Sequence, residues 1–258
     1  RRATCRTCAE SGDVSRMPEL TLVQWALGAA TAFFTGVAKT GVPGLGIMVV
    51  PLMVLAVGDA RQSAGWLLPI LCTADLFAVI YFRRHAAAGR LFSLLPWVVA
   101  GMAAGTGALF LTERILRSMV GVILLLMLTA HLWRKYRPNA SGIAPHPAAY
   151  GVSAGFATTV ANAAGPVMNL YLLSKRLPKE EFVATGAWFF FVVNLAKVPI
   201  YAGHGLFSAA SLRFDLALIP AVLAGAVTGR WLMHRIPQRV FDLLVTTLTA
   251  ASTLLLFR

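Results

Sequence analysis

Charged residues are scarce in this chain, and acidic residues are the scarcest. Only 13% of the 258 residues are charged, with 10 Asp and Glu against 23 Lys and Arg, whereas 58% are hydrophobic. This composition predicts an integral membrane protein, because a soluble domain would carry more surface charge. The basic residues stand in short clusters between apolar runs, a pattern that orients membrane helices. We therefore expect no nucleic-acid partner.

The sequence also lacks known catalytic and metal-binding patterns. It has no H-E-x-x-H motif, no Ser-His-Asp arrangement and no cluster of acids with histidines, so we expect neither enzymatic activity nor a cofactor or metal. The three cysteines give no disulfide framework, because Cys72 lies within an apolar run. Residues 1–17, which hold Cys5 and Cys8, are expected to form a disordered polar tail with Met17 as a candidate start of the protein.

What the chain does have is two series of apolar segments. A polar connector at residues 135–147 separates a first transmembrane repeat, residues 18–134, from a second, residues 148–258. Helix-breaking residues interrupt the first segment of each half, and three uninterrupted segments follow it. We expect an all-α membrane fold in which each half is a broken hairpin plus three transmembrane helices. Each hairpin is either re-entrant or a pair of short spanning helices.

The two halves align weakly with each other. Gly46 lies 119 residues before Gly165, and Asp75 lies 119 residues before Asn194. Self-similarity of this length predicts an internal structural repeat.

The basic clusters predict that the second repeat is inverted. If each broken segment enters and leaves on one side, residues 83–90, 134–146, 175–181 and 230–239 share a face, with twelve Lys or Arg against five opposite. That asymmetry places the basic face in the cytoplasm. Each repeat then crosses the membrane an odd number of times, so the second repeat is inverted relative to the first. Inverted repeats with discontinuous helices are common among secondary transporters.

Lys39 is the only charge in the apolar run of residues 20–57, and helix breakers surround it. Irregular backbone at membrane depth is tolerated where it lines a wet cavity or is buried in protein. We expect a helix that restarts after Gly44 to direct its free N–H groups into a cavity that Lys39 faces without a structural partner. The predicted anion site comprises Lys39, Thr40, Gly41, Gly44 and Gly46. The alternative is that Lys39 extends to the membrane interface.

The second break supplies hydrogen-bonding groups from the other half of the chain. Asn162, Gly165, Pro166 and Asn169 flank it. We expect the two hairpins to meet near the membrane midplane and to bind one anion jointly.

A second lysine, Lys197, follows Asn194 by one helical turn, so the two side chains share a face. We expect both to line the anion site, the alternative being a lysine near a helix end. Asp75 is the only acid well inside an apolar run. Such carboxylates are ion-paired or carry protons, and here pairing with a lysine is favoured over proton coupling.

These motifs resemble the sulfite exporter TauE/SafE family, also called the TSUP family. The matching stretches are residues 36–47 (GVAKTGVPGLGI) with Pro51, residues 151–166 (GVSAGFATTVANAAGP) and residues 194–201 (NLAKVPIY). The resemblance covers residues 18–258. It implies export or uptake of sulfur-containing anions such as sulfite, thiosulfate or organosulfonates, without a nucleotide-binding domain.

We therefore expect a secondary transporter that exports sulfite or an organosulfonate across the bacterial inner membrane by alternating access. The alternatives are a membrane-embedded enzyme or accessory subunit of sulfur metabolism, and a carrier for another anion. The expected partners are the small anion and the lipid bilayer. The sequence leaves open coupling to protons and assembly as a homodimer.

Overall fold

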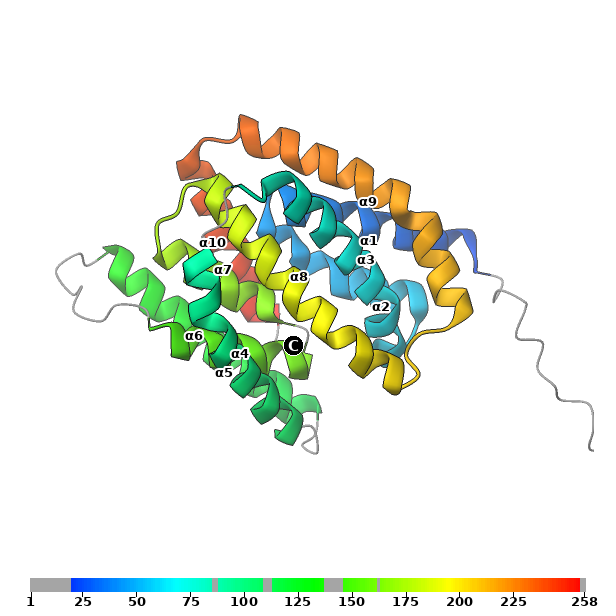
Figure 1. Ribbon diagram of the computed structural model, residues 1–258, viewed down its shortest axis with the longest axis horizontal. Helices are drawn as coiled ribbons and strands as arrows, with labels where there is room; N and C mark the ends of the chain where they lie inside the picture. Colours follow the sequence, from blue (N-terminus) through cyan, green and yellow to red (C-terminus); the bar gives the residue numbers. More distant parts are fainter. Residues whose placement is uncertain (1–19, 85–87, 109–112, 137–145, 162, 256–258) are drawn as a thin grey trace, which may run out of the picture.

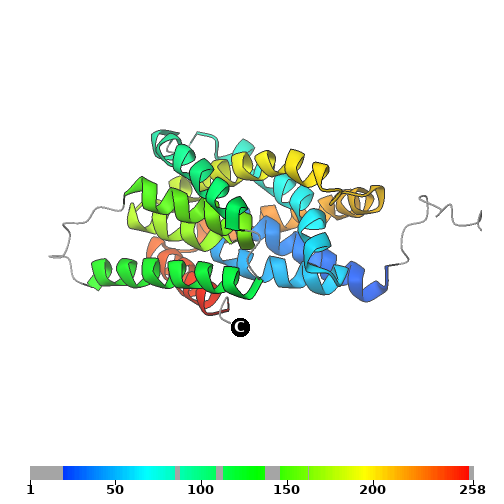
Figure 2. The same cartoon turned by 90° about the horizontal axis from the view of Figure 1, so that it is seen from below.

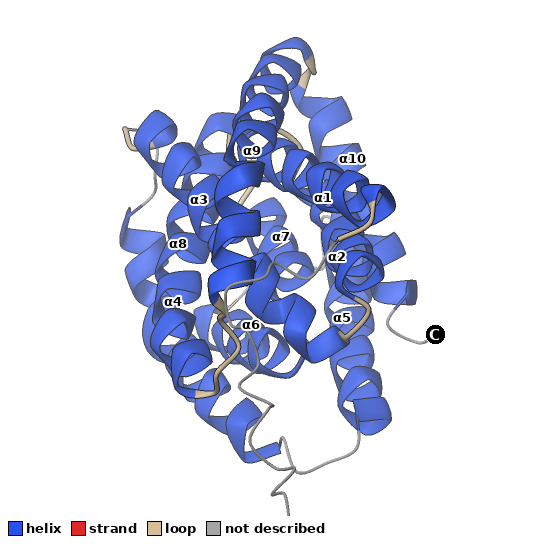
Figure 3. Cartoon of the chain, turned by 90° about the vertical axis from the view of Figure 1, so that its right-hand side faces the viewer, coloured by secondary structure: helices blue, strands red, loops and turns tan. Residues whose placement is uncertain are grey.

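The structure is a computed structural model of the chain, and it describes residues 20–84, 88–108, 113–136, 146–161 and 163–255. The described elements are helices joined by loops (Figures 1 and 3). In chain order they are α1 (Leu22–Thr40), the 3₁₀ helix η1 (Pro43–Met48), α2 (Val49–Val57), α3 (Ala60–Phe82), α4 (Ala88–Ala108), α5 (Glu113–Tyr136), α6 (Pro147–Ala161), α7 (Ala164–Ser174), α8 (Lys179–Gly203), α9 (Ala209–Arg235) and α10 (Gln238–Leu255). The predicted all-α class is confirmed. The tail, most of the connector and Asn162 lie outside the described residues.

Short polar side chains begin several of these helices. Thr21 and Gln24 form a reciprocal capping box at the start of α1, and Ser208 and Ser211 form another at the start of α9. The carboxylate of Asp59 accepts a hydrogen bond from the first turn of α3 at 2.6 Å. Each cap satisfies backbone N–H groups that have no partner inside the helix.

Four of the described helical segments are long and apolar enough to cross a membrane. They are Gln62–Phe82, Leu91–Ala108, Lys179–Gly203 and Ala209–Arg235, and Pro43–Val57 and Ser118–Trp133 are shorter apolar helices. Many leucine, valine and tryptophan side chains on their outer surfaces are exposed, as lipid contact requires. The chain is a multi-pass membrane protein.

Both predicted breaks are present in the structure, one between α1 and α2 and the other between α6 and α7. The expectation that a helix restarts after Gly44 is wrong, because a 3₁₀ turn already begins at Pro43 and α2 begins only at Val49. Proline fits a first helical turn, where its missing N–H is not needed. The backbone is therefore helical through most of the first break, although not α-helical.

Glycines let two pairs of helices pack with their backbones in contact. Gly36 of α1 lies against the backbone of α9, and Gly225 of α9 lies against Phe33. In the same way, Gly101 of α4 lies against Val152 of α6. Along α1, glycines 28, 36 and 41 meet residues 214, 222 and 229 of α9 in that order, so the two helices run in the same direction. The contacts between α4 and α6 also advance in the same direction along both helices, so this pair is parallel too.

The buried apolar side chains form two large clusters, and each draws on both halves of the sequence. One joins α1, α2, α3 and α9. The other lies mainly in α4 to α8 and α10. In Figure 2 the blue and cyan segments of the first cluster lie mostly to the right, and the green segments of the second lie to the left. Helices α3 and α8 pack against each other, at the boundary between the two clusters.

Basic residues that are far apart in the sequence gather at one end of the bundle. The guanidinium of Arg230 on α9 lies 4.0 Å from the ring centre of Tyr81, and Arg83 and Arg84 follow Tyr81 in the sequence. The ammonium of Lys179 donates hydrogen bonds to the carbonyls of Met233 and Ile236 at 2.8 and 2.9 Å. The described parts of three predicted basic clusters thus lie at the same end.

Candidate functional site

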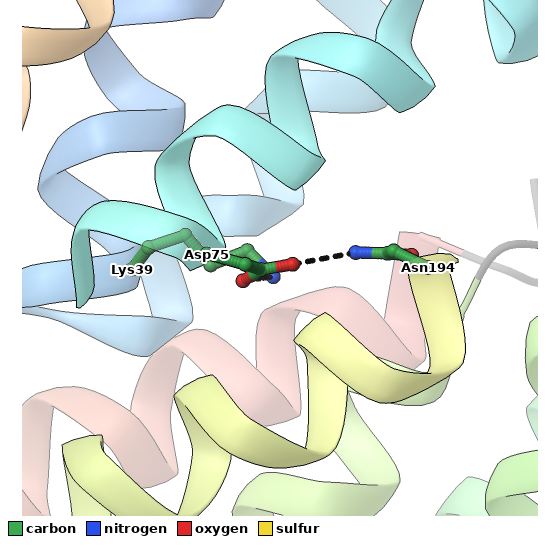
Figure 4. A network of polar contacts seen from close by, with 3 residues as sticks. All are labelled: Lys39, Asp75 and Asn194. Atoms are coloured by element: carbon green, nitrogen blue, oxygen red, sulfur yellow. Dashed lines mark hydrogen bonds and ion pairs between the residues drawn. The ribbon is translucent and has the colours of Figure 1, made fainter. Parts of the chain in front are cut away.

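Lys39, Asp75 and Asn194 form a buried polar cluster where α1, α3 and α8 meet (Figure 4). The Lys39 ammonium lies 2.7 Å from Oδ1 of Asp75. The amide of Asn194 donates a hydrogen bond to Oδ2 of the same carboxylate, also at 2.7 Å. The Asp75 side chain has no exposed surface, whereas 13% of the Lys39 side chain is exposed. Lys39 is therefore the member of the ion pair that lies nearer to open space.

Two further residues of α8 complete the surroundings of Lys39. The ring of Phe190 lies with its centre 4.0 Å from the Lys39 ammonium, a cation–π contact. Lys197 is buried and close enough to Lys39 and Asp75 for their charges to interact. Phe190, Asn194 and Lys197 recur at helical spacing, so one face of α8 presents all three to α1 and α3.

The electrostatics of this cluster favour an anion. It contains two lysine side chains and one carboxylate, and positive charge on Lys39 disfavours positive charge on Lys197. Lys39 lies in the last turn of α1, where the helix dipole stabilises positive charge. An ammonium has three N–H donors, and the described partners of Lys39 are one carboxylate oxygen and one aromatic ring. Lys39 thus retains donors for an anion.

The structure corrects one expectation about Lys39. This residue was expected to face a cavity without a structural partner, but it forms an ion pair with Asp75. The reason is the buried position of Asp75, because an unpaired carboxylate there would be strongly unfavourable. The pairing of Asp75 with a lysine, favoured from the sequence, is what the structure shows.

Three of the predicted residues near the first break serve helix packing. The Thr40 hydroxyl donates a hydrogen bond to the carbonyl of Ala226 at 2.7 Å, which ties the end of α1 to α9. Gly41 lies against Gly229, and Gly44 lies against Leu248 of α10. None of these contacts involves the Lys39 cluster.

Gly46 and Gly165 differ from those packing glycines. Within the described part of the chain, a β-carbon at either position would meet nothing within 4 Å, so open space lies beside each break among these residues. Pro166 follows in the first turn of α7 and is only partly buried. The two glycines are the pair that the sequence alignment of the halves placed at equivalent positions.

The two breaks also contact each other. The 3₁₀ helix η1 packs against α7 and α10. At this junction the Asn169 amide lies 3.4 Å from the Thr249 hydroxyl, and both residues are buried. The expected meeting of the two hairpins is therefore found, and Asn169 lies among the elements that form it. Asn162 is not among the described residues.

Sequence reasoning missed the contributions of Phe190 and Cys72. Phe190 lies four residues before Asn194, so helical spacing could have identified it. Cys72 lies three residues before Asp75 on α3 and interacts electrostatically with Asp75, Lys39 and Lys197. No sequence signal connects Thr249 with Asn169, because their contact depends on how α10 packs against α7.

The described residues include no candidate metal-binding site. No group of three His, Cys, Asp or Glu side chains there is placed to hold an ion.

Comparison with known proteins gives one match. The family model described as "Sulfite exporter TauE/SafE" matches residues 27–256 of the chain. Searches of curated proteins and of solved structures found no match. The matched region contains both breaks and every residue of the polar cluster.

Proposed function

The chain belongs to the sulfite exporter TauE/SafE family, and we propose that it is a secondary transporter that exports a small sulfur-containing anion, sulfite or an organosulfonate, across the bacterial inner membrane. The observation that carries this proposal is the cluster of Lys39, Lys197 and Asp75 between the two apolar clusters. The cluster holds two lysines and one carboxylate, and a bound anion would stabilise positive charge on both lysines.

The site that we propose spans both halves of the chain. Lys39 and Lys197 would supply charge, Asn194 would supply a hydrogen bond, and the hairpin junction near Asn169 would supply further donors. Gly46 and Gly165 would leave room for the substrate, since open space adjoins both. Thr40, Gly41 and Gly44 would shape the site through packing.

We further propose that the two halves are inverted repeats, and one observation supports this. Asp75 and Asn194 occupy equivalent positions in the two halves and hydrogen-bond to each other. Contact between equivalent residues is expected near a two-fold axis that relates the halves.

Alternating access would follow from this arrangement. The two apolar clusters would move against each other where α3 packs against α8, exposing the polar cluster to one side of the membrane at a time. The Lys39–Asp75 pair joins α1 to α3, and the Asn194 hydrogen bond joins α3 to α8. Changes in these contacts would accompany each transition.

Uptake into proteoliposomes tests the proposal. Purified protein should move labelled sulfite or a sulfonate faster than protein-free vesicles do, with weaker transport of sulfate and phosphate. Preference for another anion would favour the alternative carrier. Chemical conversion of the sulfur compound without net movement would instead favour a membrane-embedded enzyme.

A further inference from the structure

We propose that Asp75 couples anion transport to protons: the anion displaces Asp75 from Lys39, and Asp75 then takes up a proton that crosses with the anion. This inference rests on the proposed transport function and adds to it an exchange of partners within the ion pair. In the structure, Asp75 is paired with Lys39. In the anion-bound state, Lys39 would be paired with the substrate.

The surroundings of Asp75 explain why Lys39 would pair with either Asp75 or the anion at one time. Its side chain is fully buried, and Oδ1 faces Lys39 while Oδ2 accepts a hydrogen bond from Asn194. Among the described residues, Oδ1 has no hydrogen-bond donor besides Lys39. If the Lys39 ammonium moved away to pair with an anion, Asp75 would keep one neutral hydrogen-bond donor, Asn194, and the weaker charge interaction with Lys197. A buried carboxylate in that position becomes neutral by taking up a proton.

Lys39 can make this exchange because of where its side chain ends. It is partly exposed, unlike Asp75, so an anion can approach the ammonium without first contacting the carboxylate. Lys197 repels the Lys39 ammonium and would also attract the anion. A bound anion would relieve this repulsion while competing with Asp75 for Lys39.

The charged and titratable groups around Asp75 lie on helices α1, α3 and α8. Lys39 is on α1, Lys197 is on α8 and Cys72 is on α3 itself. Helix α2 carries no titratable residue. Helix α9 also packs against α3, but its Arg230 lies over Tyr81, and its Asp215 follows Phe214, which contacts Trp66 near the start of α3.

The proton and charge balance of the cycle is simple. One anion and one proton enter from the same side, Lys39 stays protonated, and Asp75 changes from carboxylate to carboxylic acid. On the other side the anion leaves, the proton returns to solution, and the Lys39–Asp75 pair forms again. A monovalent sulfonate then moves without net charge, so the membrane potential does not act on it, and export needs a sulfonate gradient larger than the opposing pH gradient. A divalent sulfite moves with a net charge of minus one, so an inside-negative potential drives it outward, against a pH gradient that is acidic outside.

Calorimetry of wild-type protein in detergent provides the first test. Methanesulfonate and sulfite are titrated near neutral pH in buffers with different ionisation enthalpies, which yields the number of protons taken up per bound anion. We expect about one, and an affinity that rises by up to about tenfold for each pH unit of acidification. The sulfite count is corrected for the titration of sulfite itself. Binding without proton uptake would overturn the inference and leave the proposed function intact, whereas no binding of either anion would contradict both.

Variants identify the group that takes up the proton. Asp75→Asn should bind without proton uptake. In proteoliposomes it should lose accumulation driven by a pH gradient. Asp215→Asn is the matched control, because Asp215 is also buried and neither of its oxygens has a hydrogen-bond partner among the described residues. Proton uptake that persists in Asp75→Asn, or disappears in Asp215→Asn alone, would refute the assignment. If Asp75→Asn does not fold, protons are counted for Lys197→Met instead, because Lys197 is the other buried group beside the anion that could take up a proton. Loss of proton uptake in Lys197→Met would refute the assignment to Asp75.

Discussion

Lys39 and Asp75 are each other's charged partner in a position where neither charge would be stable alone. Asp75 lies on α3 and is fully buried, and Lys39 reaches it from the last turn of α1. Taking one partner away from a buried pair leaves an uncompensated charge, whereas removing both does not. The pair therefore has a structural role in addition to the binding role proposed for Lys39.

The residue-scale prediction separates those two roles. Lys39→Met should lower stability by about 3–5 kcal/mol, because Asp75 is left without its counter-charge. The double variant Lys39→Met with Asp75→Asn should recover most of that loss, yet it should still fail to bind an anion. Melting temperatures in detergent and anion titrations on monodisperse protein measure both properties. A single variant that melts like the wild type would show that the pair contributes little to stability.

Residue types and spacing were enough to find most of the charged cluster. Lys39, Asp75 and Lys197 are conspicuous as charges within apolar runs, and Asn194 shares a helix face with Lys197. Which lysine pairs with Asp75 depends on how α1 packs against α3, so the sequence could not decide it. Phe190 was missed because a phenylalanine within an apolar helix gives no signal of its own.

At the scale of elements, glycines serve two different purposes. Gly36 and Gly225 allow α1 and α9 to approach until backbone meets backbone. Such small residues commonly mark helix contacts in membranes, where lipid offers no hydrophobic drive for association. Gly46 and Gly165 instead adjoin open space.

A methyl group at Gly36 should separate α1 from α9. We expect Gly36→Ala to destabilise the protein by about 1–3 kcal/mol, because the new side chain has no room against the α9 backbone. Gly107→Ala on α4 is the control, since a β-carbon there would meet no atom of the described residues within 4 Å, and it should be neutral or stabilising by up to about 1 kcal/mol. Thermal unfolding of the two purified variants gives the comparison. Equal melting temperatures would show that α1 and α9 do not depend on this close approach.

Side chains placed in the open space at the second break should affect transport more than stability. We expect Gly165→Leu to reduce anion uptake at least about tenfold, the equivalent of about 1.4 kcal/mol, while its melting temperature stays near that of the wild type. Gly203→Leu, also in open space but near the end of α8, is the control and should transport normally. Unimpaired uptake by Gly165→Leu would remove that position from the substrate's path.

The number and order of helices were predictable because apolar length and helix breakers are local signals. The same signals located both breaks. They could not distinguish a 3₁₀ turn at Pro43–Met48 from an immediate α-helical restart, because that choice depends on contacts of η1 with α7 and α10.

At the scale of the whole molecule, the basic clusters decide the orientation that we propose. Residues near 81–84, 179 and 230–236 lie at one end of the bundle, which the positive-inside rule assigns to the cytoplasm. The connector of residues 135–147 should lie on the same side, and both termini should lie outside.

Cysteine labelling of intact cells tests this topology. Cys5 and Cys8 are first replaced by serine and Cys72 by alanine. Single cysteines are then introduced by Ser141→Cys in the connector and His204→Cys after α8. A membrane-impermeant maleimide should modify only the His204→Cys protein until the cells are permeabilised. Labelling of the Ser141→Cys protein in intact cells would invert the proposed orientation.

Anion exchange in proteoliposomes tests the central claim that the polar cluster carries the substrate. Vesicles loaded with unlabelled sulfite or methanesulfonate are diluted into the labelled anion, and the entry of label is compared for the wild type, Lys197→Met and the double variant Lys39→Met with Asp75→Asn. Lys175→Met, at the basic end of the bundle, is the control. The account predicts rapid exchange by the wild type and the control, slower exchange by Lys197→Met and none by the double variant. Exchange at the wild-type rate by the double variant would contradict it.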